Sequence, residues 1–338
     1  MYDISREREL LDYLQKNGLI EGKNYSVRYF NNGVSATVAM IENDKKSIIA
    51  KQALAKLNVA ADWACDQSRM LVEQKALTTY SKIIKEYVPA PIFYDEENYI
   101  MVREAAPRSS SMWKEQLLKG VLDFSVAEKA AQALSAIHNR TAGDQQVAEE
   151  FKEIKFFYDL RIEPYIETVV KVHPQLKEHA DRIVDRLMNQ KIALVHGDYS
   201  PKNILVDQDR LYVLDLEVSH YGNPAFDLAF FTNHFVLKAV KNSRWYNAYL
   251  TMLDFIAQSY LKAIEFADAK EFEHEAVQIL AYHMLARIDG KSPAEYITDS
   301  LDKDIVRAVA FKIIEQDSSC YDDVISELAA VLRKSKKY

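Results

Sequence analysis

The stretch from residue 194 to 231 constrains this chain more than any other. It holds three short apolar runs separated by turn residues, a pattern that predicts strands and a following helix. Polar side chains stand where these runs begin or end. They are His196, Asp198, Asn203, Asp215, Glu217 and Asp227.

This arrangement of acids and an amide is typical of a site that holds a metal and a phosphate. A loop with Asp198 at one end and Asn203 near the other can aim both side chains into one cleft. The period of two in an extended segment places Asp215 and Glu217 on one side. Carboxylate and amide oxygens are good magnesium ligands, and a carboxylate can accept the proton of a hydroxyl. Each residue alone could be a turn or cap, but the set at this spacing favours a site.

The pattern along the rest of the chain predicts two lobes of an α+β protein. A chain of 338 residues is longer than one core usually supports. Strand patterns dominate up to residue 104 and helical patterns follow, so we place the boundary between 1–104 and 105–338. The first lobe should hold helices at 4–17 and 62–85 and strands at 25–30, 36–42, 47–52, 92–94 and 99–102.

The second lobe should be mostly helical around a pair of strands. Capping boxes at Ser125 with Glu128 and at Ser292 with Glu295 mark two of the helix starts. The strand pair is expected at 204–206 and 211–214. Helices are expected at 112–119, 125–138, 148–171, 176–189, 225–241, 243–267, 270–287, 293–298, 300–316 and 320–334.

Composition excludes several classes of function. The net charge of -7 disfavours nucleic acid as a partner, which would require a basic surface. The two cysteines, Cys65 and Cys320, are too few for a disulfide framework or a cysteine metal site. The N-terminus is polar, unlike a signal peptide, and no apolar run reaches the ~18 residues of a membrane span. We therefore expect a cytoplasmic protein, a monomer or homodimer, with no membrane partner.

Lys51 lies inside an apolar strand, in Ile-Ile-Ala-Lys, and such a lysine requires an anionic partner unless its head reaches solvent. Glu73 is the candidate, because it borders the apolar face of the following helix beside Met70 and Leu77. The turn 31–35 precedes Lys51 by one strand and contains Gly33 and Ser35. Taken alone it is an ordinary hairpin turn.

Together these motifs resemble the aminoglycoside phosphotransferase and choline kinase superfamily, the small-molecule relatives of protein kinases. The resemblance rests on His-Gly-Asp-x4-Asn at 196–203, Asp-x-Glu at 215–217 and Gly-x-Pro-x-x-Asp-Leu-Ala from Gly222. Lys51-Gln-Ala-Leu, Trp63…Arg69…Glu73 and the stretch 113–120 are most similar to methylthioribose kinases. Those enzymes usually show Asp-Pro-Glu-Phe at 215–218 and often lack the asparagine, so this chain departs from them at both places.

The resemblance implies a bilobal protein-kinase-like fold and roles for each motif, with ATP and Mg²⁺ as cofactors. Asp198 would be the catalytic base that orients the acceptor hydroxyl. Metal ligation would fall to Asn203, Asp215 and Glu217. Asp227 would hold the catalytic loop by accepting backbone N–H bonds, and His196 would anchor that loop rather than carry protons.

For the nucleotide, the resemblance implies that Lys51, fixed by Glu73, meets the α- and β-phosphates. Gly33 and Ser35 could contact the phosphates, and the segment with Glu104 and Ala106 would bind adenine through its backbone. Near the C-terminal part, Arg287 could line the acceptor site. Asp289 and Lys291 fit a solvated loop of mixed charge.

Two hypotheses follow. The first is a magnesium- and ATP-dependent kinase for a hydroxyl of a small metabolite, such as a sugar (methylthioribose included), an amino alcohol or an aminoglycoside-like compound. The second is an inactive kinase fold that binds nucleotide or a partner, which the intact motif residues disfavour. A protein kinase is disfavoured too, because Gly222 follows Asp215 almost at once and leaves no activation segment. The sequence leaves the acceptor open.

Overall fold

The computed structural model describes residues 2–22, 24–30, 36–54, 66–208 and 210–335. The chain forms two compact units, residues 1–108 and 109–338. The predicted boundary after residue 104 lies at the end of the last strand of the first unit. A small antiparallel sheet in the first unit and many helices in the second confirm the predicted α+β class.

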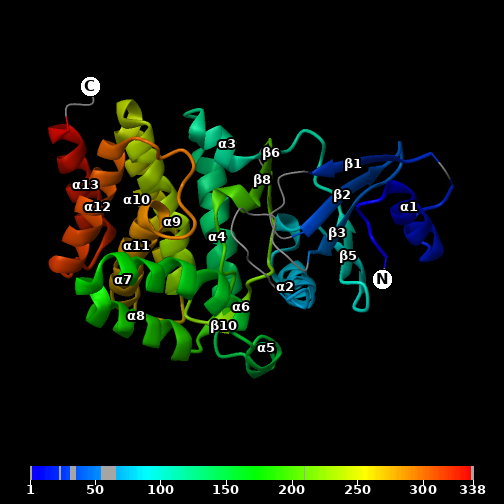
Figure 1. Ribbon diagram of the computed structural model, residues 1–338, viewed down its shortest axis with the longest axis horizontal. Helices are drawn as coiled ribbons and strands as arrows, with labels where there is room; N and C mark the ends of the chain where they lie inside the picture. Colours follow the sequence, from blue (N-terminus) through cyan, green and yellow to red (C-terminus); the bar gives the residue numbers. More distant parts are fainter. Residues whose placement is uncertain (1, 23, 31–35, 55–65, 209, 336–338) are drawn as a thin grey trace. The chain divides into compact units, whose positions relative to one another are not determined.

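The first unit is built on a five-stranded antiparallel sheet with the order β1-β2-β3-β5-β4 (Figure 1). Its strands are β1 Ser26–Phe30, β2 Ala36–Glu42, β3 Ser47–Ala53, β4 Pro91–Asp95 and β5 Ile100–Glu104. Strand β3 lies in the middle, where Lys51 pairs with Val38 on one side and Met101 on the other. Because side chains alternate along a strand, β3 presents Ile48 and Ala50 to one face and Lys51 to the other.

Each face of this sheet is covered by one helix. Helix α1 (Glu7–Lys16) packs Leu10 and Leu14 into a buried cluster with Ile48 and Ala50. Helix α2 (Arg69–Ile83) lies against β3, β4 and β5, and the 3-10 turn η1 (Lys85–Tyr87) follows it. The first part of the predicted helix 62–85, up to residue 65, lies outside the described residues.

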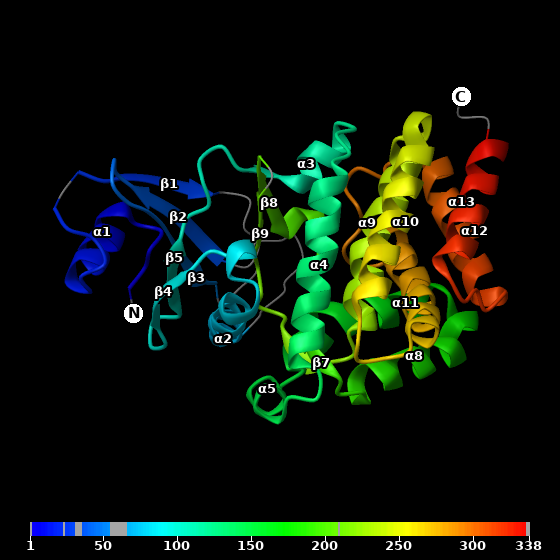
Figure 2. The same cartoon turned by 180° about the vertical axis from the view of Figure 1, so that it is seen from behind.

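The second unit is organised around helix α9 (Ala225–Lys241), which is buried along nearly its whole length. A helix that is buried on all sides must be covered by others, and α10 and α11 lie along it (Figures 1 and 2). The other long helices of the second unit are α4 Phe124–Thr141, α8 Lys177–Asn189, α10 Tyr246–Ala263, α11 Ala269–Asp289, α12 Ser300–Glu315 and α13 Tyr321–Lys334. The shorter elements are α3 Trp113–Leu118, η3 Pro174–Leu176 and η5 Ser243–Trp245.

Two small antiparallel sheets deliver the central motif. One has the order β6-β8-β9 and the other pairs β10 with β7. Their strands are β6 Ser111–Met112, β7 Ala193–Val195, β8 Ile204–Asp207, β9 Arg210–Val213 and β10 His220–Gly222. The 3-10 turn η4 (Pro201–Asn203) leads directly into β8.

Three details differ from the sequence predictions. Helix α4 is capped by Asp123, whose carboxylate accepts hydrogen bonds from the backbone N–H groups of Ser125 and Val126, so the Ser125 capping box is wrong. The predicted helix 293–298 is a turn. Its intended cap, Ser292, instead accepts hydrogen bonds from the guanidinium of Arg287 through its carbonyl and its hydroxyl.

The predicted helix 148–171 is divided into four pieces. They are α5 Gln145–Glu150, α6 Lys155–Phe157, the π-helix η2 Tyr158–Glu167 and α7 Thr168–Val172. Pro164 lies inside η2 and has no N–H to donate, which interrupts regular α-helical bonding there. Among the described residues, none of the helices has the length and apolar character of a membrane span.

Candidate active site

Gly197 allows the loop after β7 to make its sharp turn. Its φ of +76° lies in the left-handed region, and a Cβ there would come within 2.8 Å of the carbonyl oxygen of Val218. Only glycine avoids both problems. The sequence His-Gly-Asp therefore turns tightly enough to present Asp198 directly after a buried strand.

Asp227, at the start of α9, ties this loop to the helix. Its carboxylate is fully buried and accepts hydrogen bonds from the backbone N–H groups of His196 (2.6 Å) and Gly197 (2.9 Å). Nε2 of His138 lies 3.2 Å from the same carboxylate. Burial alone would raise the pKa of Asp227, but the hydrogen bond and charge of His138 outweigh it, so the pKa is lowered and the group stays ionised.

His196 is part of the same framework. Its Nδ1 accepts the backbone N–H of Asp198 at 3.1 Å, and its ring is completely buried. Burial lowers the pKa of His196, so the neutral imidazole is the stable form. The ring thus holds the turn between residues 196 and 198.

Asp198 has one engaged and one unengaged carboxylate oxygen. Oδ2 lies 2.9 Å from Nδ2 of Asn203, 2.9 Å from Nζ of Lys202 and 3.1 Å from the guanidinium of Arg161. Oδ1 is buried and has no hydrogen-bond partner in the described part of the chain. Buried polar atoms are normally paired, so an unpaired oxygen in a rigidly held carboxylate suggests a ligand hydroxyl.

Sequence reasoning missed Arg161 and Lys202. Arg161 projects from the π-helix η2, donates through Nε to the carbonyl of Gly197 at 2.5 Å, and lies over the rings of Phe230 and Tyr165. Burial alone would lower the pKa of Arg161, but the charge of Asp198 raises it. The sequence signal near Arg161 was Pro164, because a proline inside a helical pattern indicates an irregular turn. Irregular π-helical turns often accompany functional sites. Lys202 stood inside the motif as an unassigned position.

Asp215 and Glu217 follow β9 and lie close together. One carboxylate oxygen of each lies within 4.8 Å of the other. The extended segment expected here is wrong, because β9 ends at Val213 and Asp215 adopts a φ of +65°. A tight turn, rather than the alternation of a strand, brings the two carboxylates together.

In the first unit, Lys51 and Glu73 form the predicted ion pair. Nζ of Lys51 lies 2.7 Å from Oε2 of Glu73, and both side chains are buried. Glu104 is the exposed last residue of β5 and Ala106 is half-buried in the coil after it. Gly33 and Ser35 lie outside the described residues.

Near the end of α11, the three charged residues separate into different roles. Asp289 accepts hydrogen bonds from Arg307 and His173, and Lys291 pairs with Glu163, so both are engaged in structural contacts. Arg287 is held by Ser292, yet its Nε is buried without a hydrogen-bond partner among the described residues.

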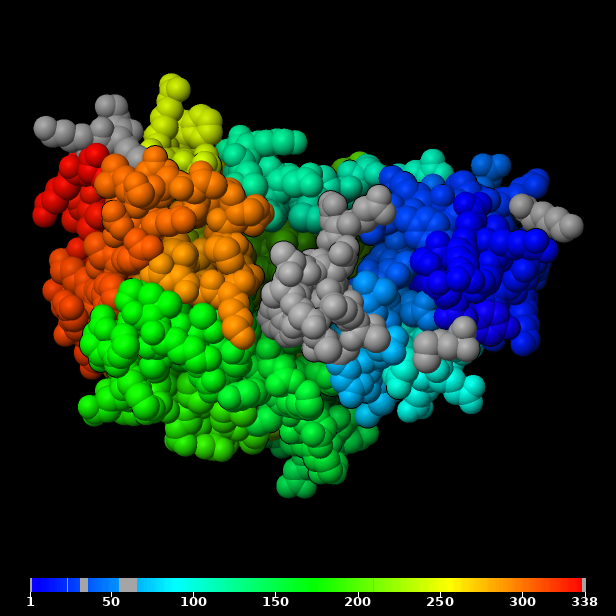
Figure 3. All heavy atoms as spheres, in the orientation of Figure 1, coloured from blue at the N-terminus to red at the C-terminus, as the bar shows by residue number. Residues whose placement is uncertain are grey.

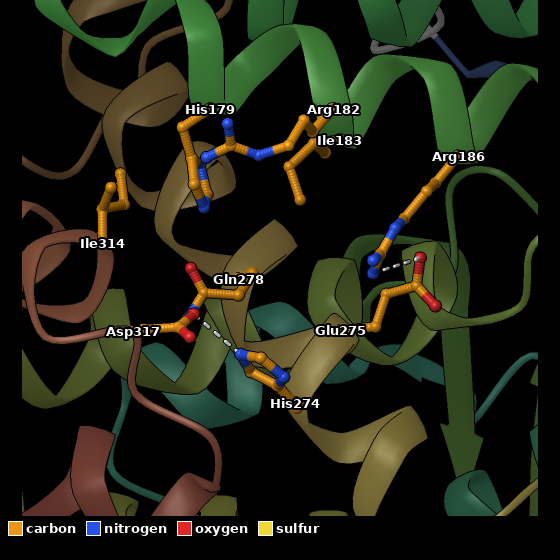
Figure 4. A pocket seen from close by; sticks show the side chains of 9 residues that line it. All are labelled: His179, Arg182, Ile183, Arg186, His274, Glu275, Gln278, Ile314 and Asp317. Carbon is orange, nitrogen blue, oxygen red and sulfur yellow. Dashed lines mark hydrogen bonds and ion pairs between the residues drawn. The ribbon is translucent and has the colours of Figure 1, made fainter.

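A separate pocket in the second unit lies between α8 and α11 (Figure 4). Its charged groups already pair with one another or with neighbours. Arg186 pairs with Glu275 at 3.9 Å and His274 pairs with Asp317 at 2.8 Å. The charged groups of this pocket are therefore satisfied by one another or by neighbours, and Oε1 of Gln278 is a buried lining atom without a hydrogen-bond partner in the described part of the chain.

Comparison with family models assigns the chain to a class of enzymes. The model of the phosphotransferase enzyme family matches residues 87–258, half of the chain, so the protein belongs to that family. Membership confirms the family recognised from the motifs and the predicted enzyme class, a small-molecule phosphotransferase.

Relatives of known activity point the same way. The methylthioribose kinase of Bacillus mycoides is 24% identical over 69% of this chain, and that of Bacillus cereus (strain ATCC 10987 / NRS 248) is 25% identical over 71%. The aligned regions cover 66% and 67% of those relatives, so the chain spans about two thirds of their length.

Solved structures share the fold. A choline/ethanolamine kinase family protein from Mesorhizobium loti matches with a TM-score of 0.57 and 13% identity, over 95% of this chain and 99% of its own. The choline kinase of Cryptosporidium parvum matches with a TM-score of 0.54 and 13% identity, over 98% and 96%. These likenesses confirm the predicted protein-kinase-like fold.

Proposed function

We propose that this phosphotransferase uses ATP and Mg²⁺ to phosphorylate a hydroxyl group of a small-molecule acceptor. The observation that carries the proposal is the state of Asp198. Asn203, Lys202 and Arg161 engage its Oδ2, while its buried Oδ1 has no partner in the described part of the chain. An acceptor hydroxyl that donates to Oδ1 would be oriented for attack and could release its proton to the carboxylate.

Positioning supplies most of the catalytic effect in this scheme. Asp227 and His196 hold the turn that carries Asp198, and the ion pair with Arg161 fixes the orientation of the Asp198 carboxylate. A reacting group that is already oriented avoids the entropy cost of finding its geometry. The two cations beside Asp198 also provide positive charge near the place where the phosphoryl oxygens would lie.

Asn203, Asp215 and Glu217 fit a magnesium ion as a set. The amide nitrogen of Asn203 donates to Asp198, which leaves its amide oxygen for a metal. The neighbouring carboxylates of Asp215 and Glu217 add the hard oxygen ligands that Mg²⁺ prefers. When bound, the ion would neutralise charge on the phosphates.

For ATP binding we assign Lys51, with Glu73 holding its side chain in place. Gly33 and Ser35 would approach the phosphates, and the backbone at Glu104 and Ala106 would bind the adenine. Solved structures of the same fold support nucleotide binding, because APH(2'')-Ib is ADP-bound and APH(2'')-IIa forms a ternary complex with streptomycin and ATP. A cytoplasmic location belongs to the same proposal, since the enzyme needs ATP.

Methylthioribose is the first acceptor to test, because the curated relatives are methylthioribose kinases. Amino alcohols and aminoglycosides come next. Arg287 is placed at the acceptor or the transferred phosphate, since its Nε has no protein partner among the described residues.

The test is ATP consumption over a panel of methylthioribose, choline, ethanolamine, homoserine, hexoses and aminoglycosides. We expect magnesium-dependent turnover with one class, reduced at least about a hundredfold in Asp198→Asn. Turnover at the wild-type level in that variant would refute the role of Asp198. Undetectable binding of ATP by calorimetry, with magnesium present, would refute the kinase and leave a kinase fold that binds a partner.

A further inference from the structure

Helix α9 carries a buried lysine without an acidic partner. The side chain of Lys238 has no exposed surface, and no carboxylate in the described part of the chain lies within salt-bridge distance. Its one hydrogen bond there is a long one, 3.3 Å to the carbonyl of His234. The C-terminal end of α9 offers partial negative charge, but a buried ammonium without a counter-ion is costly.

The neighbours of Lys238 increase this imbalance. Burial and the positive charges of Lys114 and Arg287 lower the pKa of Lys238 to about 7. Glu295 is the acid nearby, and it is engaged in an ion pair with Lys114. Nζ of Lys238 instead lies over the ring of Tyr296, 5.3 Å from its centroid.

Several other polar atoms here lack partners. Nε2 of His234, the hydroxyl of Tyr296 and Nε of Arg287 are buried without a hydrogen bond in the described part of the chain. All three can donate a hydrogen bond. Native interiors rarely leave such groups unpaired, so a bound group that accepts several hydrogen bonds would satisfy them.

The positive field extends from this cluster to the catalytic aspartate. Burial alone would raise the pKa of Tyr165, but the charges of Arg287, Arg161 and Lys202 outweigh it and lower the pKa. Arg161 and Lys202 in turn contact Asp198. Positive charge is therefore present both beside Asp198, from Arg161 and Lys202, and beside Lys238, from Lys114 and Arg287.

We propose that the acceptor carries an oxyanion, a carboxylate or a phosphate ester, which is bound by Lys238, His234, Tyr296 and Arg287. This inference rests on the proposed kinase function and names the class of its substrate. An acceptor of this kind would supply the missing counter-charge, and its hydrogen bonds to charged donors would be strong ones. Cationic acceptors such as choline would meet repulsion instead.

The ligand would reach Lys238 past the turn that connects α11 to α12. Tyr296 belongs to this turn and is half-buried, and its ring lies against Nζ of Lys238. Figure 3 shows the orange chain that follows α11 at the surface of this unit.

The experiment compares acceptors that lack an anionic group with related compounds that carry one. The probes are glucose, gluconate and glucose 6-phosphate, together with homoserinol and homoserine. Binding is measured by calorimetry with ATP-free protein, and turnover is measured by ADP release. The variants are Lys238→Met and, as a matched control, Lys241→Met, which removes an exposed lysine from the same helix.

We expect an anionic probe to bind at least about tenfold more tightly than its neutral partner, because a charge-assisted hydrogen bond is gained. Lys238→Met should weaken that binding about ten- to a hundredfold and leave the affinity for ATP unchanged. Lys241→Met should behave as wild type. Thermal unfolding checks that both variants fold, and we expect Lys238→Met to be no less stable, since it removes an unpaired buried charge.

The outcomes separate the two proposals. Equal binding of charged and neutral probes, or undiminished anion binding in Lys238→Met, would overturn the anionic acceptor, whatever the turnover shows. Preference for gluconate or for glucose 6-phosphate would identify a carboxylate or a phosphate. Failure of every compound to stimulate ADP release, with anion binding intact, would contradict the kinase function alone. An effect of Lys238→Met on ATP affinity would show that the cations serve the nucleotide and would also overturn the inference.

Discussion

Replacing Asp227 by asparagine should loosen the catalytic loop and destabilise the second unit. Oδ2 of Asp227 accepts hydrogen bonds from the backbone N–H of His196 and from His138, while Oδ1 accepts the N–H of Gly197. The side chain of asparagine has one acceptor oxygen, and its NH₂ group would face one of the N–H donors that the second carboxylate oxygen of Asp227 now accepts. One charge-assisted hydrogen bond is lost, about 1.5–3 kcal/mol, and a buried N–H is left unsatisfied, about 1–3 kcal/mol.

Together these losses amount to about 2.5–6 kcal/mol, which corresponds to a decrease in unfolding temperature on the order of 10 °C. Calorimetry measures the temperature, and hydrogen exchange at the amide of Gly197 reports the loop itself. The matched control is Asp299→Asn. Asp299 also accepts two backbone N–H bonds, from Leu301 and Asp302, but as an exposed helix cap where asparagine serves equally well.

The effect should depend on pH in a defined direction. Burial is the largest single influence on the pKa of Asp227 and raises it, but the interactions with His138 and His196 together outweigh burial, so the pKa in the folded protein is lowered. Its contribution is therefore present above the unfolded pKa and is lost as the pH falls through the folded value. The difference between wild type and Asp227→Asn should shrink below about pH 4. Equal unfolding temperatures and exchange rates for Asp227→Asn and Asp299→Asn would refute this account.

Two further substitutions test the local geometry. Gly197→Ala should abolish most ATP turnover and destabilise the second unit by about 1–3 kcal/mol or more, because it combines a left-handed φ with a 2.8 Å approach to Val218; a normal unfolding temperature would contradict it. Lys51→Met should destabilise the first unit by about 3–5 kcal/mol, since it breaks a buried ion pair by removing one of its two partners. The double variant Lys51→Met with Glu73→Gln should recover most of that stability without recovering ATP binding, and failure of this rescue in calorimetric unfolding would contradict the ion-pair argument.

The sequence alone determined the features that depend on local pattern. Helix α9 was predicted with its bounds, 225–241, because a long apolar run after a glycine and a proline permits little else. The strands of the first unit and the pairing of Lys51 with Glu73 followed from periodicity and from the need of a buried lysine for an acid. The family and the phosphotransferase class also followed, because the motif residues have a specific spacing.

Only the tertiary structure decided the contacts between distant segments. Arg161 contacts Gly197 and Asp198, which lie more than thirty residues away in the sequence. It does so from a π-helix that the hydrophobic periodicity did not predict. The turn at Asp215 and the capture of Ser292 by Arg287 replace local patterns that looked regular. The burial of Lys238 without an acid depends on which helices surround it. Local propensity determines how a segment folds, whereas the charge that a buried side chain meets is set by packing.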